Sequence, residues 1–597
     1  MKKGRSYYLR WILMVYREHR RFVLFLLFLT VFTTAVTTLY PLVYKYIVDS
    51  LVDSLEGYHE GTLSLESAMA ERNKLILILI AFGIGMTVTN VYPYFRARLN
   101  LAFEISLRKM YFDKVINKSY RFFQKYRTGD IATRLSEDIS THPPGVSWFL
   151  CSGIFRAFNS SCIILFCLIS MWILNPVLTM LSLIPIPLMM FLFFRLESVV
   201  GKKFRIFRKS VSETNDFLES AYSGIKILKS FNSEKYQKRV FENMLENRKG
   251  IEKDVMAIQG LFSIYFEFLN YLGQVFVLLF GGIMVIRGNI TLGTYIAFYS
   301  YLGMIVWPIT DIPNFFVMGT QACVTIDRLE EISSFEPEYR DADPEREKVQ
   351  ELDDIRVENV SFEFNQSDRP EQKDFRIQNI NFSLKRGEKI AIVGKIGSGK
   401  TTLLNLLTGI YEPDSGEVRI NNRPLKEYDK DTFRKKIGYI EQLPVIISES
   451  VYTNIDFWRD LDGSVISGAA RTAQIYEEID NLPDKFSTQL GQRGIGFSGG
   501  QKQRLSIARA LSGNPDIVIM DDVTSAMDAE NELNFWQRLL EKAPDITTLI
   551  VTHRMSTARK ADRIIVLNNG VIEAQGTHEE LEKTSPTYRE LIGDYSM

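Results

Sequence analysis

The chain contains little cysteine and no excess charge of either sign. Its 597 residues include four cysteines, and 71 Lys and Arg balance 71 Asp and Glu. Three of the cysteines, Cys151, Cys162 and Cys167, fall in one apolar segment and none forms a CxxC pair, so neither a disulfide framework nor a metal site is indicated. The neutral charge gives no reason to expect a nucleic-acid partner. No cleavable signal peptide is evident, because the first apolar run is too long and no small-residue cleavage site follows it.

Apolar residues are unevenly distributed along the chain. Residues 1–320 contain long apolar runs, whereas 330–597 resembles a soluble α/β protein. A helix needs about 20 mostly apolar residues to cross a bilayer. Six stretches have this length and are predicted to span the membrane: 22–45, 74–95, 147–172, 177–196, 262–286 and 292–316. The shorter amphipathic stretch 8–16 is expected to lie along the membrane surface.

Basic residues indicate the orientation of these spans. With the N-terminus inside, the segments 1–21, 96–146 and 195–255 carry roughly thirty Lys and Arg, against about four in the external loops. Two internal stretches, 122–138 and 219–235, each interrupt a long helical pattern near its middle. We expect each to form a short helix across the tip of a helical hairpin.

Several polar residues lie at membrane depth in the predicted spans. Charged groups there are costly and normally face a bundle interior or a wet cavity. Such residues either contact a substrate or simply pair with one another between helices, and the sequence leaves both possibilities open. The candidates for a substrate cavity are Arg156, Glu267, Asn270, Gln274 and Asp311.

The cytosolic half begins with strand patterns and a glycine-rich loop. Strands are predicted at 355–364, 379–385 and 389–394, and the last is followed by the sequence GKIGSGKT. This loop satisfies G-x-x-x-x-G-K-[ST] between a strand and a helix, an arrangement that holds a nucleotide phosphate. Lys400 can reach the β- and γ-phosphates and the Thr401 hydroxyl can hold Mg²⁺. The predicted ATP-binding residues of the loop are Gly394, Lys395, Gly397, Ser398, Gly399, Lys400, Thr401 and Thr402.

Two further patterns accompany this loop. The apolar run IVIMDD places Asp521 and Asp522 at the end of a strand, where Asp521 is expected beside the metal ion. The segment FSGGQ, around Ser498, has glycines before a helix start and forms a second candidate anion site.

The whole chain resembles ATP-binding cassette (ABC) exporters, on the evidence of these motifs and their order. SGGQ (Ser498, Gly499, Gly500 and Gln501) is similar to the family signature. Gln442 matches the Q-loop, Asp528 closes a D-loop-like SAMD, and His553 matches the switch histidine. The stretches 122–138 and 219–235 resemble the two intracellular coupling loops.

The resemblance implies a fold class and a division into domains. The fold is an α-helical six-span transmembrane domain fused to an α/β P-loop nucleotide-binding domain. Residues 1–330 would form the membrane domain, 331–354 the linker and 355–597 the nucleotide-binding domain. It also implies an integral protein of a bacterial plasma membrane, with the N-terminus and the nucleotide-binding domain in the cytoplasm.

The resemblance further implies that two such subunits dimerise head to tail. Each ATP, with Mg²⁺, lies between the phosphate loop of one subunit and the signature of the other. Gln442 and Asp521 would join Thr401 at the metal, His553 would contact the γ-phosphate, and Phe364 would stack on adenine where the family usually has Tyr.

Two positions depart from the family pattern. Asp522 occupies the place of a catalytic Glu, and the shorter side chain displaces the carboxylate by more than about 1 Å, which can cost about 100-fold in rate. Gln492 also replaces a favoured Glu. We therefore expect Asp522 to be a weakened base, as in heterodimeric exporters in which the partner supplies the Glu and has an altered signature.

The expected function is ATP-driven export or flipping of a hydrophobic or amphipathic substrate by such a heterodimer. The alternatives are a homodimeric exporter with two slow sites and an ATP-gated protein that does not pump. An importer is disfavoured by the fusion of the two domains, and a soluble DNA-repair ATPase is excluded by the spans.

Overall fold

The fold is taken from a computed structural model that describes residues 4–335, 346–364, 376–491, 496–523, 529–542 and 545–594. The chain forms two compact units. Unit 1 comprises Met1–Asp113 and Ala132–Ser333, and unit 2 comprises Lys114–Ile131 and Ser334–Met597. The segment Lys114–Ile131 thus belongs with the C-terminal half, although long helices of unit 1 flank it in the sequence.

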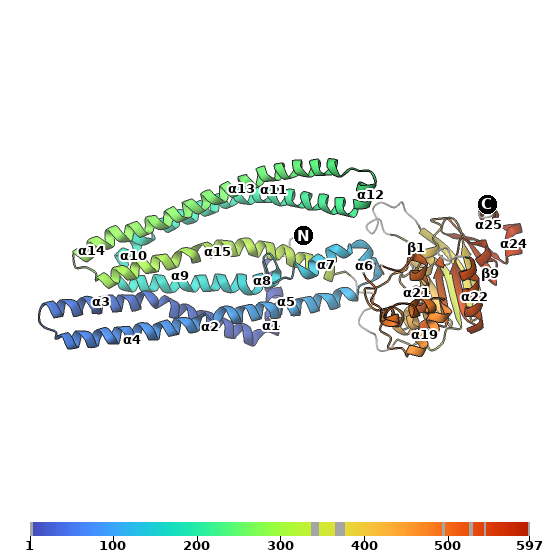
Figure 1. Cartoon of the computed structure of the whole chain (residues 1–597), viewed down its shortest axis with the longest axis horizontal. Coiled ribbons are helices and arrows are strands. Elements are labelled where there is room, and N and C mark those ends of the chain that lie inside the picture. Colours follow the sequence, from blue (N-terminus) through green and yellow to red (C-terminus); the bar gives the residue numbers. More distant parts are fainter. Residues whose placement is uncertain are drawn as a thin grey trace. The chain divides into compact units, whose positions relative to one another are not determined.

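Unit 1 is built from helices, many of them long (Figure 1). Its helices, with α5 and α7 continuing into unit 2, are α1 (Arg5–Glu18), α2 (Arg20–Thr38), α3 (Tyr40–His59), α4 (Leu65–Thr89), α5 (Tyr92–Ile116), α7 (Thr128–Ser136), α8 (Val146–Trp148), α9 (Ile154–Leu174), α10 (Pro176–Leu183), α11 (Pro185–Ser223), α12 (Ile225–Ser230), α13 (Glu234–Phe276), α14 (Gly282–Ile286) and α15 (Leu292–Ser333). The short helix α12 lies within the stretch 219–235, and another, α6 (Tyr120–Lys125), overlaps the stretch 122–138.

Four helical stretches in the described part of the chain are long and apolar enough to cross a membrane. They are Arg20–His59, Leu65–Ile116, Val146–Leu174 and Leu292–Ser333, and a shorter apolar helix covers Tyr271–Ile286. The four contain the first, second, third and sixth predicted spans. The predicted spans 177–196 and 262–286 include side chains outside the described set, so the count of six remains a prediction.

The last turns of α15 are held by aromatic side chains. Glu330 accepts hydrogen bonds from the hydroxyls of Tyr7, at 3.1 Å, and Tyr111, at 2.7 Å, and from the Trp11 indole at 3.2 Å. The Tyr8 hydroxyl donates to Asp327 at 2.7 Å. These contacts attach the N-terminal helix α1 to the end of α15.

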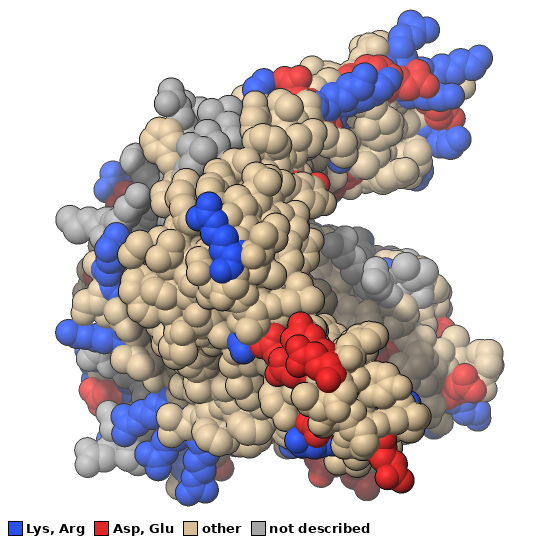
Figure 2. All heavy atoms as spheres, turned by 90° about the vertical axis from the view of Figure 1, so that its left-hand side faces the viewer, with Lys and Arg blue, Asp and Glu red and all other residues tan. Residues whose placement is uncertain are grey.

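The end of unit 1 that carries the α3–α4 turn is mostly uncharged, with a group of acidic side chains (Figure 2). Exposed acids near this turn are Asp53, Glu56, Glu60 and Glu66. The turn between α14 and α15 adds one basic residue, Arg287.

Unit 2 contains two β-sheets. An antiparallel sheet has the order β2 (Arg376–Lys385), β1 (Asp354–Glu363), β4 (Ser415–Ile420) and β5 (Arg423–Pro424). The second sheet has the order β10 (Val571–Gly576), β9 (Arg563–Asn568), β3 (Lys389–Val393), β8 (Thr547–Val551), β7 (Ile517–Asp521) and β6 (Ile437–Ile440). Five of its strands, β9 to β6 in this order, are parallel. The predicted strands at 355–364, 379–385 and 389–394 are confirmed, with small differences at their ends.

Helices surround these sheets in unit 2. They are α6, α16 (Lys400–Leu407), α17 (Lys430–Lys435), α18 (Val451–Asp456), α19 (Gly463–Thr472), α20 (Tyr476–Asp480), α21 (Gly499–Ser512), α22 (Ala529–Lys542), α23 (Met555–Ala558), α24 (His578–Thr584) and α25 (Pro586–Asp594). The strands β7 and β8 are buried along their whole length, which explains why their sequences are continuous apolar runs instead of alternating patterns.

Candidate functional site

Several of the predicted site residues of unit 2 follow strands of the parallel sheet. The strands β3, β8, β7 and β6 run in the same direction, so their carboxyl ends meet at one edge. The glycine-rich loop follows β3, His553 follows β8, and Asp521 ends β7. Gln442 comes two residues after β6. Ligands of open α/β sheets bind at this edge, as predicted for these residues.

The loop between β3 and α16 forms a cradle that needs glycine. A Cβ atom on Gly394 would lie 2.1 Å from the carbonyl oxygen of Leu567, while Gly397 and Gly399 have φ of +81° and +104°. The Ser398 hydroxyl is buried and has no hydrogen-bond partner among the described residues. A buried donor beside a helix N-terminus fits a bound phosphate.

Lys400, the first residue of α16, turns back over this loop. Its ammonium group donates hydrogen bonds to the carbonyls of Gly394 and Lys395, each at 2.9 Å. Burial lowers the pKa of Lys400, and the nearby carboxylates of Asp521 and Asp522 partly oppose that shift. A cation held over the cradle is placed to bind phosphate oxygens.

Thr401 and Asp521 contact each other directly. The Thr401 hydroxyl donates to Asp521 Oδ2 at 2.8 Å. Burial raises the pKa of Asp521, with a further contribution from Asp522, while Thr401, Lys400 and His553 act in the opposite direction. A hydroxyl and a carboxylate in contact form an oxygen-donor pair of the kind that Mg²⁺ prefers.

Asp522 is fixed at the end of β7. Its backbone has φ of +47°, and its N–H donates to the carbonyl of Val551 at 2.9 Å. The residue is only 7% exposed. Asp tolerates a left-handed backbone. Because the hydrogen bond to Val551 of β8 holds the main chain of Asp522, the carboxylate has little freedom to move forward.

His553 lies close enough to these groups for their charges to act on it. Burial lowers its pKa, and Lys400 lowers it further, against the opposing effect of Asp522 and Asp521. These effects together favour the neutral imidazole. Gln442 is exposed, and the adjacent Glu441 carbonyl accepts a hydrogen bond from Gln503 of α21 at 3.2 Å.

Phe364 stands beside an aromatic residue that the sequence did not indicate. Tyr411 stacks on Phe362, with centroids 5.0 Å apart, and meets Phe364 edge-on at 5.7 Å. Tyr411 also accepts a hydrogen bond from Gln124 of α6 and contacts Tyr120 at 5.9 Å. The candidate adenine platform is thus connected to α6 through one side chain. Tyrosines that follow a helix are common, so the sequence around Tyr411 carries no specific signal for its contact with Phe364.

The signature segment forms the start of α21. Ser498 is the N-cap: its hydroxyl accepts from the Gln501 N–H at 3.2 Å, and the Gln501 side chain accepts from the Ser498 N–H at 2.8 Å. Ser498 and Gly499 are exposed, and Gly500 is half-buried. This capping box orders the helix start and leaves its face available to a ligand from outside the chain.

Four other predicted positions complete the comparison with the sequence. Thr402 is half-buried on α16, and Lys395 pairs with Glu590 at 2.7 Å. Asp528 and Gln492 lie outside the described residues.

Two of the residues predicted at membrane depth pair with each other. Arg156 Nε lies 2.9 Å from Asp311 Oδ1, and the Ser160 hydroxyl donates to Asp311 Oδ2 at 2.8 Å. Pairing between helices, one of the two possibilities left open by the sequence, is therefore present between α9 and α15.

The other predicted cavity residues lie on α13. Gln274 accepts a hydrogen bond from the Tyr299 hydroxyl at 3.2 Å, and Glu267 is exposed. The Asn270 side chain is outside the described set.

Comparison with known proteins agrees with this arrangement. Residues 23–309 match the ABC transporter transmembrane region, and 377–525 match the ABC transporter family. A probable multidrug resistance ABC transporter ATP-binding/permease protein of Bacillus subtilis (strain 168), YheI, is 31% identical over 81% of this chain and 81% of its own length. The chain belongs to the ABC transporter family. This ABC transporter has both a membrane region and an ATP-binding domain, so it is a transporter ATPase.

Two further similarities extend over most of the chain. An ATP-dependent lipid A-core flippase of Syntrophus aciditrophicus (strain SB) is 29% identical, covering 88% of this chain and 87% of its own. The solved structure of a bacterial Atm1-family ABC exporter with ATP bound has a TM-score of 0.80 at 20% identity, covering 97% of this chain and 98% of that one. The ABC transporter therefore has the fold of that exporter.

Proposed function

We propose that this chain is one half of a heterodimeric ABC exporter, and that its own phosphate-loop site binds ATP but hydrolyses it slowly. The observation that carries this proposal is Asp522, which stands next to Asp521 where the family has Glu. The sequence keeps the glycine-rich loop, Lys400, Thr401 and His553, so among these residues the shorter carboxylate is the departure that bears on hydrolysis.

The fixed backbone of Asp522 supports this interpretation. Its N–H is bonded to β8 through Val551, so the main chain cannot easily advance to compensate for the missing methylene. A water molecule oriented by this carboxylate would lie about 1 Å from the best position, and a misplacement of that size costs about 100-fold in rate.

Mg²⁺ would be held by Thr401, Asp521 and Gln442, whose oxygen atoms fit this metal. When bound, Mg²⁺ neutralises charge on the β- and γ-phosphates. Lys400 would bind the same phosphates, His553 would contact the γ-phosphate, and Phe364 with Tyr411 would flank adenine.

Asp522→Glu is the direct test. Restoring the methylene should increase ATP hydrolysis at this site by about tenfold or more, because the carboxylate regains its reach. The measurement is the single-turnover rate of ATP cleavage at this site in the assembled transporter. Asp522→Asn, which removes the charge, serves as the control and should not increase the rate. An unchanged rate in Asp522→Glu would contradict the weakened-base assignment.

Two alternative functions are compatible with most of these features. A homodimer would have two slow sites, and the purified chain alone would then show the full ATPase activity of the transporter. An ATP-gated protein without pumping would bind ATP but would not move substrate against a gradient. The heterodimer predicts low activity of the chain alone and a large increase when a Glu-bearing partner is added.

The substrate class is proposed as hydrophobic or amphipathic, because polar groups lie among otherwise apolar helices. Arg156, Asp311, Glu267 and Gln274 would line the path, with Asn270 as a further candidate. The Arg156–Asp311 pair removes the cost of isolated charges at this depth. Multidrug and lipid flippase relatives are consistent with this chemistry.

Cysteine substitutions test this path. Glu267→Cys and Asp311→Cys, in a background without the four native cysteines, should react with a polar thiol reagent applied from the cytosolic side without nucleotide. Leu165→Cys, at an exposed apolar position of α9, is the control and should stay unreactive. Folded protein in which neither acidic position reacts would contradict the assignment.

We also propose that the α3–α4 turn is external and that the N-terminus and the ATP-binding domain are cytoplasmic, in a bacterial plasma membrane. The exposed residues next to the α3–α4 turn support this orientation, because Asp53, Glu56, Glu60 and Glu66 are acidic and basic residues accumulate on the inner side.

A further inference from the structure

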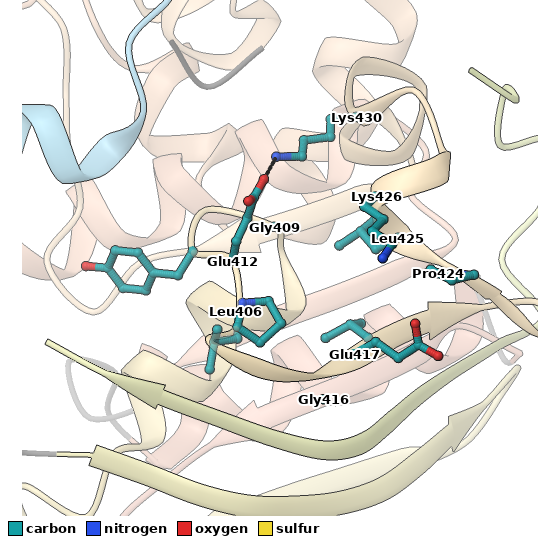
Figure 3. Close-up of a pocket in the computed structure, with 12 residues that line it drawn as sticks. Leu406, Gly409, Glu412, Gly416, Glu417, Pro424, Leu425, Lys426 and Lys430 are labelled. Atoms are coloured by element: carbon teal, nitrogen blue, oxygen red, sulfur yellow. Dashed lines mark hydrogen bonds and ion pairs between the residues drawn. The ribbon is translucent and has the colours of Figure 1, made fainter. Parts of the chain in front are cut away.

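The first helix, α1, and the start of α2 carry an excess of exposed positive charge. Over residues 4–21 the exposed charged side chains are one acid, Glu18, and five arginines: Arg5, Arg10, Arg17, Arg20 and Arg21. Within the described part of the chain, no ion pair or hydrogen bond engages the side chains of these arginines. Elsewhere a cation such as Lys430 is paired, with its ammonium group 3.0 Å from Glu412 Oε1 (Figure 3). The arginines at the start of the chain are therefore available to an anion from outside it.

The exposed side of α1 combines an apolar row with a basic row. Leu9 and Leu13 are each 59% exposed, and they share a row because they are four residues apart. Arg10 and Arg17 form a second row beside it, since Leu13 stands three residues from one and four from the other. We call these four residues the outer face of α1. Trp11, only 5% exposed, points to the opposite side of the helix.

The outer face lies next to a membrane span in the sequence. The helical stretch Arg20–His59, long and apolar enough to cross a membrane, begins two residues after the end of α1. A helix at this boundary can place its leucines against acyl chains and its arginines among the head groups. Guanidinium groups bind phosphate oxygens through paired hydrogen bonds. An anionic lipid suits this face better than a zwitterionic one, because it brings no cation of its own toward the arginines.

The inner side of α1 is attached to the end of α15. Hydrogen bonds from the aromatic side chains of α1 reach Glu330 and Asp327, as described above. The next residue, Glu331, pairs with Arg134 of α7 at 3.0 Å. The last turns of α15 therefore connect α1 to α7, so a ligand that orders α1 also acts on this connection.

We propose that the outer face of α1 binds an anionic phospholipid of the leaflet on which it lies, and that the bound lipid holds α1 against α15. Arg10 and Arg17 bind the lipid phosphate, and Leu9 and Leu13 contact its acyl chains. Lipid composition thereby regulates the connection from α1 through α15 to α7. Lipid binding does not depend on the function proposed above, whereas an effect on ATP turnover would.

Phosphatidylglycerol is the probe, and phosphatidylcholine with identical acyl chains is its control. Binding to the full-length chain in a neutral detergent is measured by native mass spectrometry. Phosphatidylglycerol should bind at least about tenfold more tightly than phosphatidylcholine. Arg10→Gln together with Arg17→Gln should remove about tenfold or more of the phosphatidylglycerol affinity, because each arginine contributes to head-group attraction. Unchanged phosphatidylcholine binding by this double variant shows that it is folded.

Two further variants control for charge. Arg10→Lys together with Arg17→Lys keeps both cations and should retain most of the affinity. Lys226→Gln together with Lys253→Gln removes two exposed cations from α12 and α13 and should bind phosphatidylglycerol as the wild type does. Equal binding of the two lipids, or unchanged phosphatidylglycerol binding in the double arginine-to-glutamine variant, would overturn the proposed surface.

An additional arm separates a lipid from a soluble phosphate. Leu9→Ser together with Leu13→Ser should weaken phosphatidylglycerol binding about threefold or more, since apolar contact with the acyl chains is lost. Inorganic phosphate at about 10 mM should not displace the lipid, because it lacks the apolar part. Displacement by phosphate, with no effect of the leucine changes, would assign a soluble anion to the arginines and overturn the lipid assignment.

Hydrogen exchange tests the connection to α15. In nanodiscs, replacing part of the phosphatidylcholine by phosphatidylglycerol should slow exchange of residues 5–18 and 327–333 in the wild type, and should not do so in the double arginine-to-glutamine variant. Tyr7→Phe together with Tyr8→Phe should keep lipid binding and reduce the slowing at 327–333, because two hydrogen bonds to α15 are removed. Normal lipid binding with unchanged exchange at 327–333 in the wild type would overturn the regulatory role. None of these outcomes depends on whether the chain forms a heterodimer.

Discussion

Ser498→Ala is expected to reduce the steady-state ATPase rate of the assembled transporter by about 100-fold, the loss typical for removing one transition-state hydrogen-bond donor. In the proposed heterodimer, the working site combines the partner's phosphate loop with Ser498–Gln501 of this chain. The exposed N-cap of α21 can present its hydroxyl to that site. The measurement is phosphate release at saturating ATP.

Two controls accompany this change. Ser498→Thr keeps a hydroxyl at the N-cap and should retain most of the activity, which separates the loss of the donor from the loss of the cap. Asp522→Asn should change total activity less than twofold, since its own site contributes little. If Asp522→Asn stops hydrolysis as completely as Ser498→Ala, Asp522 is a full catalytic base and the homodimer becomes the better interpretation.

Lys400→Ala should weaken ATP binding at this chain's own site by about 100-fold or more, because the main cation for the β- and γ-phosphates is removed. The Lys400 ammonium group already lies over the cradle, bonded to the Gly394 and Lys395 carbonyls. Binding is measured with labelled ATP under conditions in which the partner's site is blocked.

Lys485→Ala is the matched control, since it removes an exposed lysine paired with Asp480 at 2.9 Å, away from the loop. ATP binding should then be unchanged. Near-normal binding by Lys400→Ala would mean that the phosphate loop has been assigned wrongly.

The arrangement of the phosphate site could be predicted because its causes are local. Gly394 has no room for a Cβ, and Gly397 and Gly399 need a left-handed backbone, so the sequence pattern reflects the geometry directly. The buried strands β3 and β7 also have local signals, and parallel pairing brings their carboxyl ends to one edge. The contact between Asp521 and Thr401 follows from this pairing.

Contacts between distant segments could not be predicted in this way. The tyrosine at 411 joins Phe364 to α6, and nothing in its neighbourhood distinguishes it from an ordinary core tyrosine. The sequence allowed a pair between membrane-depth charges, but whether Arg156 meets Asp311 depends on how α9 and α15 pack. The π-helical turns at Phe149–Gly153 and Val277–Gly281 likewise have no simple sequence signal.

The assignment of Lys114–Ile131 to unit 2 has a consequence for recombination. A chimera that exchanges only the segment after Ser333 would carry Tyr411 and Asp414 into a chain whose α6 evolved against another surface. In that chimera, Tyr411 and Asp414 would lose the contacts that Gln124 and Arg121 make in this chain. A modular exchange needs three junctions, two around α6 and one after α15. An exchange of the ATP-binding unit therefore has to move two separated segments of the chain together.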